Sequence, residues 1–243
     1  MGSDIQYTYR SGAERTLNLP ASLFTEGKLD QAAHQWKKKP VQGARRLFLA
    51  DFTREQFGNW KVFNEEKEVL ESPPAQDETL AMILASSPWQ LGRSRGTREG
   101  ASSLQVDERN PEYRFILNPI FGENSRVVGV TGMLLDEKYF RQHVLPTTIC
   151  RILPGFFPES VADGMAVTVR DRQGGTVYST GPSDLKGETV KARLPFVFAD
   201  WTIDLVSARN MPEQLAGATF AFNITLSILL ALALLGGVAF AFR

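Results

Sequence analysis

The feature that most constrains this chain is a long uncharged stretch near its C-terminal end. Residues 216–242 contain no charged side chain and are dominated by Leu, Ala, Phe and Ile. A helix buried in a soluble core usually has an apolar run of about 10–14 residues, whereas a helix that crosses a bilayer needs about 20. The sequence therefore predicts a single transmembrane helix over residues 216–242.

Small side chains recur along this span at a spacing of four residues. They are Ser227, Ala231, Ala233, Gly237 and Ala241. Residues at this spacing lie on one side of a helix, and small ones let two helix backbones approach closely in a membrane. We expect this side of the helix to pack against another membrane-protein subunit or against a second copy of the chain.

The rest of the chain has the composition of a water-soluble domain. Over the whole sequence 27 basic and 27 acidic residues cancel, and no long run of like charge occurs, so nucleic acid is not an expected partner. Residues 1–215 suffice for one large domain or two small ones. Because Cys150 is the one cysteine, we expect neither an internal disulfide nor a thiolate zinc site.

Alternation of apolar and polar residues predicts several β-strands. They cover residues 44–52, 59–64, 113–121, 127–136, 188–198 and 200–209. The strands over 113–121 and 127–136 form a predicted hairpin. A second hairpin is predicted over residues 165–180, with its turn at Gly174 and Gly175.

Helical spacing of apolar residues predicts two helices within the soluble part. One covers residues 77–87, and the other covers residues 136–157, where Pro146 and Pro154 are expected to interrupt or end it. Residues 89–112 are predicted to form a polar loop, rich in Gly and Arg. Such a loop can be ordered by docking on a partner.

Two of these patterns together resemble a known family. Residues 118–146, "NPIFGENSRVVGVTGMLLDEKYFRQHVLP", are followed after a gap by residues 164–180, "GMAVTVRDRQGGTVYST". This pair resembles the extracytoplasmic sensor region of bacterial receptor histidine kinases, of the Cache or PAS-like type. In that family a strand, a turn, a "VVGVxGxxLD" strand and a helix recur, and a hairpin lies in the membrane-proximal part. The resemblance covers residues 44–210.

The resemblance implies an α+β fold, in which antiparallel PAS/Cache-like sheets with covering helices precede one C-terminal transmembrane helix. It implies an extended or helical N-terminal segment, a PAS/Cache-like domain, a membrane-proximal β subdomain and the membrane helix. These parts are residues 1–43, 44–160, 161–210 and 216–242. It also implies a pocket of the kind in which the relatives bind small molecules. The phosphoacceptor histidine and the ATP-binding domain of the kinases are not recognised in this sequence.

The reactive side chains and motifs of the sequence do not predict an enzyme. His34 and His143 do not have the spacing of metal ligands. The string "GRSRG" at residues 92–96 has the spacing G-x-S-x-G, but it lies in the predicted polar loop and not in the strand–turn–helix context of a nucleophile motif. The sequence contains no glycine-rich phosphate-binding motif and no haem attachment motif. We therefore expect a protein that is not an enzyme and that needs no metal or cofactor.

The strand over residues 113–121 carries the candidates for binding a polar ligand. Its odd-numbered residues share one face and its even-numbered residues share the other, and apolar counts do not decide which face is inside. Arg114 and Asn118 share the even-numbered face, and we name them as ligand contacts, with Trp60 as a wall of the pocket. The alternative is structural, because a strand arginine is often paired with a carboxylate and a tryptophan is often part of the core.

Two functions of different class remain open. In the first, the chain is a non-catalytic, single-pass protein of the inner (cytoplasmic) membrane, whose periplasmic sensor-like domain binds a ligand in signal transduction. In the second, it is a structural accessory subunit that stabilises a larger membrane complex, for example a respiratory or photosynthetic one. Arg243 follows the span and favours a cytoplasmic C-terminus, although residues 1–20 lack the apolar core of a signal peptide.

Overall fold

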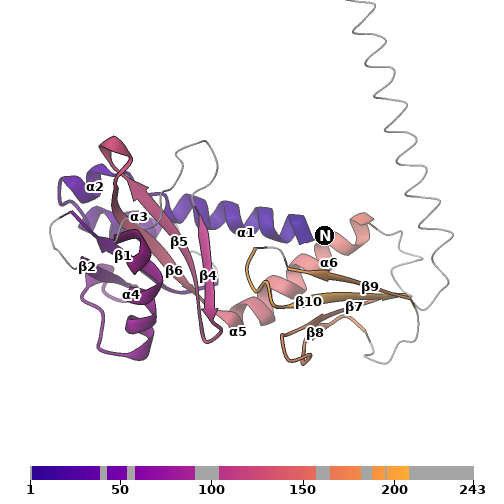
Figure 1. Ribbon diagram of the computed structural model, residues 1–243. Coiled ribbons are helices and arrows are strands. Elements are labelled where there is room, and N and C mark those ends of the chain that lie inside the picture. The colour runs from indigo at the N-terminus through magenta and orange to yellow at the C-terminus, as the bar shows by residue number, and fades with distance from the viewer. Residues whose placement is uncertain are drawn as a thin grey trace, which may run out of the picture. The chain divides into compact units, whose positions relative to one another are not determined.

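The computed structural model describes residues 2–38, 43–53, 58–90, 104–156, 165–181, 188–194 and 196–207. The chain divides into two compact units. Unit 1 consists of Met1–Phe156 and Arg193–Trp201, and unit 2 consists of Phe157–Ala192 and Thr202–Arg243. The described parts are antiparallel sheets with helices, which confirms the α+β fold class (Figure 1).

Unit 1 begins with helices and continues as a sheet into which one further helix is inserted. The helices are α1 (Gly2–Leu17), α2 (Ser22–Thr25), α3 (Asp30–Lys38) and α4 (Asp77–Gln90). The strands are β1 (Ala44–Asp51), β2 (Asn59–Asn64), β3 (Val69–Glu71), β4 (Gln105–Asn110), β5 (Tyr113–Phe121) and β6 (Val127–Leu135). A short 3-10 turn, η1 (Glu123–Ser125), joins β5 to β6.

The described strands of unit 1 form one six-stranded sheet in the order β3-β2-β1-β6-β5-β4, with antiparallel neighbours. Helix α4 packs on β5 and β6 from one face, and from the other face α1 packs on the same two strands and α2 packs on β6 (Figure 1). Both faces are therefore buried. This explains why Leu47, Phe48, Leu49 and Ala50 of β1 form a continuous apolar run rather than an alternating one.

Two glycines of β6 allow aromatic rings to lie directly on the sheet, one on each face. A Cβ atom at Gly132 would lie 2.2 Å from Cζ of Phe48, on the α4 face. A Cβ atom at Gly129 would lie 2.4 Å from Cε1 of Phe24, which comes from α2 on the other face. The glycines of the "VVGVTG" pattern are therefore required by close packing rather than by backbone conformation.

The helix after β6 is continuous through both prolines. It comprises α5 (Glu137–Tyr139), the π-helical turn η2 (Phe140–Val144) and α6 (Leu145–Phe156). The Asp136 side chain caps its start by accepting a hydrogen bond of 2.9 Å from the backbone N–H of Tyr139. The sequence-based expectation that Pro146 interrupts this helix is not met. The π-helical turn lies immediately before Pro146, where it accommodates the missing N–H donor.

Unit 2 contains a smaller sheet. Its described strands are β7 (Met165–Arg170), β8 (Thr176–Ser179), β9 (Glu188–Arg193) and β10 (Thr202–Ser207), in the order β8-β7-β10-β9. The predicted hairpin is confirmed as β7 and β8, and its turn includes Gly174 with a φ of +82°. Asp171 closes this turn by accepting backbone N–H groups from Gln173 and Gly175 at 2.9 and 2.8 Å.

Two other expectations need correction. The predicted polar loop over residues 89–112 contains strand β4, which pairs with β5. Strand β4 lies at the edge of the sheet, where a strand can be polar at consecutive positions. It therefore lacks the alternation of apolar and polar residues by which strands were predicted. The predicted strand over residues 188–198 ends at Arg193, and the residues that follow it belong to unit 1.

The predicted membrane span, residues 216–242, and its small side chains lie outside the described residues. Within the part of the chain that the structure describes, no helix is both long enough and apolar enough to cross a membrane.

Candidate functional site

The three residues proposed as ligand contacts do not come together. Trp60 pairs with Ala50 across the β1–β2 ladder and lies on the α4 face, where its Nε1 donates a hydrogen bond of 2.9 Å to Oγ of Ser86. Arg114 and Asn118 lie on the opposite face, because they alternate with Phe115 and Leu117 of the α4-side core. Trp60 therefore cannot be a wall of the same pocket.

Arg114 is paired with carboxylates of the protein itself. Its side chain is 6% exposed and forms an ion pair of 2.6 Å with Asp200, and Glu108 lies 3.4 Å away. The guanidinium also lies over the ring of Phe198, 4.8 Å from its centroid. Burial alone lowers the pKa of Arg114, but hydrogen bonding and charge pairing with Asp200, aided by Glu108, outweigh burial and raise the pKa.

Residues 198–201, which the pair of Arg114 and Asp200 ties to β5, are packed by aromatic rings. Phe198 and Trp201 stack at 4.3 Å between centroids, and Phe140 lies 4.6 Å from Phe198. Phe198 has a φ of +54°, and its backbone N–H and that of Ala199 both donate to the carboxylate of Glu108. The described residues of this segment are thereby fixed to strands β4 and β5 of unit 1.

Asn118 is a structural residue of the opposite sheet face. Its Nδ2 donates a hydrogen bond of 2.9 Å to the carbonyl oxygen of Leu17, the last residue of α1. Oγ1 of Thr131 donates to the same carbonyl at 2.5 Å. Because the last carbonyls of a helix lack partners within the helix, these side chains satisfy the buried end of α1.

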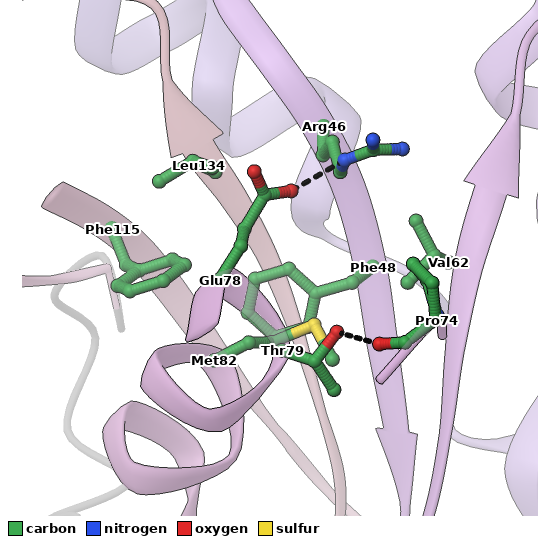
Figure 2. Close-up of a pocket in the computed structure, with 9 residues that line it drawn as sticks. All are labelled: Arg46, Phe48, Val62, Pro74, Glu78, Thr79, Met82, Phe115 and Leu134. Atoms are coloured by element: carbon green, nitrogen blue, oxygen red, sulfur yellow. Dashed lines mark hydrogen bonds and ion pairs between the residues drawn. The ribbon is translucent and has the colours of Figure 1, made fainter. Parts of the chain in front are cut away.

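A solvent-open depression lies between α4 and the sheet, on the face opposite Arg114. We call it the α4 depression. The space in it that a water-sized group can occupy is about 10 Å³. Its lining consists of Arg46, Phe48, Val62, Pro74, Glu78, Thr79, Met82, Phe115 and Leu134 (Figure 2).

The α4 depression has an apolar floor and a charged edge. Phe48, Phe115 and Leu134 come from three adjacent strands of the sheet, and Met82 comes from α4 (Figure 2). At the edge, Oγ1 of Thr79 donates a hydrogen bond of 2.6 Å to the carbonyl oxygen of Pro74, which holds the first turn of α4 to the segment before it. A concave apolar surface with a few fixed polar groups is the usual composition of a small-molecule site.

Two consecutive arginines of β1 reach one carboxylate at this edge. Arg46 forms an ion pair with Oε1 of Glu78, and Nη2 of Arg45 lies 3.0 Å from Oε2 of the same residue. Consecutive strand residues normally point to opposite faces. Here the pairing of β1 with β6 shifts its register between Ala44 and Arg46, and a β-bulge of this kind turns neighbouring side chains to the same side.

Sequence reasoning missed this cluster. The bulge that brings Arg45 and Arg46 together is set by the pairing with β6, which local alternation does not reveal. One signal was present in the sequence: a pair of basic residues at the start of a strand, and an acidic residue in the first turn of a predicted helix.

The histidines do not contribute to this site. The His143 ring stacks on Tyr139 with 4.5 Å between ring centroids, and His34 is exposed on α3. Among the residues that the structure describes, no group of His, Cys, Asp and Glu side chains is arranged to hold a metal ion.

No protein-family model matches the sequence, and no curated protein does. Similar solved structures include an extracellular ligand binding receptor from Desulfohalobium retbaense, with 11% identity and a TM-score of 0.40, covering 85% of this chain but 38% of that one. The periplasmic sensory domain of the Campylobacter jejuni chemoreceptor Tlp1 is 13% identical, with a TM-score of 0.39 and 86% of each chain covered.

The sensory domain of the Campylobacter jejuni chemoreceptor Tlp3, with isoleucine bound, is 14% identical. Its TM-score is 0.42, and the match covers 85% of this chain and 84% of that one.

Proposed function

We propose that this chain is a non-catalytic, single-pass membrane protein whose sensor-like domain lies in the periplasm and binds a small molecule in the α4 depression. The observation that carries the proposal is the composition of that depression, with an apolar floor of Phe48, Phe115 and Met82 and an ion-paired edge. A ligand there would contact a helix and the sheet together. Its binding would therefore bias how α4 packs on the sheet.

The order of elements along the chain supplies a route from this site toward the predicted span. Strand β5 contributes Phe115 to the floor, and the adjacent Arg114 holds Asp200. The chain continues from Asp200 directly into β10, and the predicted span over residues 216–242 follows β10 in the sequence. A shift of β5 would therefore act on the segment that leads to the membrane anchor.

A small-molecule screen on the full-length chain tests this proposal, with the thermal midpoint as readout. A compound that binds the native state raises the midpoint. The variant Thr79→Trp places a large ring at the edge of the depression and should abolish the effect of a hit. Leu80→Trp is the matched control, because Leu80 is 57% exposed on the same helix and does not line the depression.

The proposal predicts hits that stabilise the wild-type protein and the Leu80→Trp variant but not the Thr79→Trp variant. Hits that stabilise all three proteins equally would place the binding site elsewhere. If a broad library contains no stabilising compound, the ligand-binding proposal fails.

A second function is favoured by one specific observation. Arg114 and Asn118, the polar groups that a pocket on their sheet face would use, are already paired with Asp200 and with the carbonyl oxygen of Leu17. A domain whose interior is filled by its own contacts suits a structural role. We therefore propose, as the alternative, an accessory subunit that stabilises a larger membrane complex through this domain and the predicted span.

Gentle detergent extraction from native membranes, followed by size separation and mass spectrometry, separates the two functions. An accessory subunit would migrate with other membrane proteins at a fixed stoichiometry. A sensor would be recovered alone, as a dimer, or as part of a longer signalling polypeptide, and that recovery would contradict the accessory role.

A further inference from the structure

We propose that helix α4 pairs with the α4 helix of a second copy of this chain, in an antiparallel arrangement, through the side of the helix that faces away from the sheet. We call this side the outer α4 stripe, and it consists of Leu80, Ile83, Leu84 and Ser87. The contact joins two copies of the chain and does not depend on ligand binding in the α4 depression.

Helix α4 is apolar on both of its sides. The residues that face the sheet are buried, and they are Met82, Ala85, Ser86 and Trp89. On the outer α4 stripe, Leu80 and Leu84 are 57% and 56% exposed, although they lie one turn apart on the same side of the helix. Residues 80–90 contain no charged side chain. A surface helix normally has a polar outer side, and a helix that is apolar all round is normally covered on all sides.

Arg109 of β4 lies beside the outer α4 stripe. Because Pro88 has no N–H group, the carbonyl oxygen of Leu84 lacks the donor that a regular helix would supply. Nη2 of Arg109 donates to this oxygen at 3.3 Å, and Oγ of Ser87 donates to it at 3.1 Å. The guanidinium of Arg109 is 68% exposed. Its hydrogen bonds within the described part of the chain come from Nε and Nη2, so Nη1 is left for a further acceptor.

Asp77 supplies the complementary charge. It is the first residue of α4 and lies three and seven residues before Leu80 and Leu84, which places it on the same side of the helix. It is exposed, whereas the neighbouring Glu78 is already paired with two arginines. An outward-facing carboxylate therefore lies at one end of the outer α4 stripe, and a guanidinium lies near the other.

An antiparallel pair of helices uses both features at once. A two-fold axis that passes between Leu80 and Leu84 places Leu80 of each copy against Leu84 of the other. The same axis brings Asp77 of each copy to Arg109 of the other. The apolar contact and both charge pairs are thus formed by one symmetric arrangement, which is why the second copy fits this surface.

The contact is one helix wide, and this limits its strength. Stable interfaces of standard size bury about 1,200–2,000 Å², and a single pair of helices lies at or below the low end of that range. We therefore expect weak association in dilute solution. The predicted span over residues 216–242 would confine two copies to one membrane and raise their effective concentration.

Cysteine cross-linking of the full-length chain in native membranes tests the proximity of the two helices. In a Cys150→Ser background, Ile83→Cys places a thiol near the expected two-fold axis, and Glu66→Cys places one in an exposed turn as the control. Mild oxidation should give a disulfide-linked dimer through residue 83 and not through residue 66. If residue 83 forms no link, or links to a different protein, the assignment of a second copy is wrong.

Sedimentation equilibrium of the full-length chain in mild detergent measures the dissociation constant. Leu84→Ala should raise it at least about tenfold, because each dimer loses two buried leucine side chains. Val69→Ala is the matched control, because Val69 is 45% exposed on β3 and lies outside the outer α4 stripe. A dissociation constant that Leu84→Ala leaves unchanged would place the dimer contact elsewhere and overturn the proposal.

A double-mutant cycle tests the charge pairs. Asp77→Asn and Arg109→Gln should each raise the dissociation constant about fivefold, and the double variant should show about the same increase, because both changes remove the same pairs. Within one copy, Asp77 lies about 15 Å along the helix from Ser87, which is too far for the two groups to couple. If the two effects multiply in the double variant, the antiparallel arrangement is wrong.

Discussion

Arg114 on β5 and Asp200 before β10 are joined by two hydrogen bonds although 86 positions separate them in the chain. The distances are 2.6 Å from Nη1 to Oδ1 and 3.0 Å from Nη2 to Oδ2. This paired geometry is the strongest that a guanidinium and a carboxylate form. Because Arg114 is buried and also lies over the ring of Phe198, the pair fixes the position of the segment that leads into β10.

Breaking this pair should destabilise unit 1. In the variant Asp200→Asn, the buried guanidinium of Arg114 loses its main anionic partner. Asp200 is 28% exposed, so we expect the low end of the range for a broken buried pair, a loss of about 3 kcal/mol in the free energy of unfolding. Chemical denaturation measures it. Glu112→Gln, a change at an exposed carboxylate, serves as the control. If the two substitutions lowered the free energy of unfolding equally, the pair of Arg114 and Asp200 would have no special stabilising role.

Replacement of Gly132 by Ala should also be destabilising. The new Cβ atom would lie 2.2 Å from the buried ring of Phe48, which must then move within a packed core. We expect a cost of about 1–3 kcal/mol. The matched control is Gly12→Ala in helix α1, where nothing lies within 4 Å of the new atom, and there a gain of about 0.5–1 kcal/mol is expected. Thermal denaturation should give a lower midpoint than the wild type for Gly132→Ala and a higher one for Gly12→Ala, and equal shifts would contradict this account of Gly132.

The ion pair of Asp107 and Arg109 predicts a dependence of stability on pH. Burial alone raises the pKa of Asp107, but the hydrogen bonds and charge of Arg109, 2.6 Å away, outweigh burial and lower it. A carboxyl group with a lowered native pKa stabilises the fold above its ordinary pKa, and this contribution is lost as the pH falls through the lowered value.

The Asp107→Asn variant should therefore be less stable than the wild type at pH 7. The expected difference is under about 1 kcal/mol, because Arg109 is 68% exposed and solvent screens the pair. The difference should shrink as the pH falls below about 4 and should vanish once Asp107 is protonated. Urea denaturation at several pH values measures it. A difference that grows toward low pH would have the wrong sign.

The central strands could be predicted from the sequence because their side chains alternate or run apolar in short bounded segments. The predicted ranges 59–64 and 113–121 agree with β2 and β5. Strand β4 could not be found in this way. It lies at the edge of the sheet and carries Asp107, Glu108 and Arg109 without needing a buried face.

The site was harder to predict, because its residues are brought together by long-range pairing. Arg114 and Asn118 were correctly placed on a common face, but their partners, Asp200 and the carbonyl of Leu17, lie 86 and 101 positions away. The convergence of Arg45 and Arg46 on Glu78 depends on a register shift between β1 and β6. Local periodicity contains no information about either arrangement.

The predicted membrane span can be tested separately. If residues 216–242 span a bilayer, the full-length chain should stay in the membrane pellet after an alkaline carbonate wash, because a spanning helix is not released by high pH. A chain that ends at residue 207, after β10, should appear in the supernatant. Release of the full-length chain by the wash would argue against a spanning helix.

The most direct test of the central claim is a methyl NMR spectrum of the full-length chain, labelled at its methionine methyl groups. The spectrum is recorded with and without the compound that most raises the thermal midpoint. Met82 lines the α4 depression, whereas Met133 is fully buried beside Leu134 and faces the opposite side of the sheet. If the compound binds in the α4 depression, the Met82 signal shifts on binding and the Met133 signal does not. A shift of Met133 with no change at Met82 would contradict a ligand site in the α4 depression.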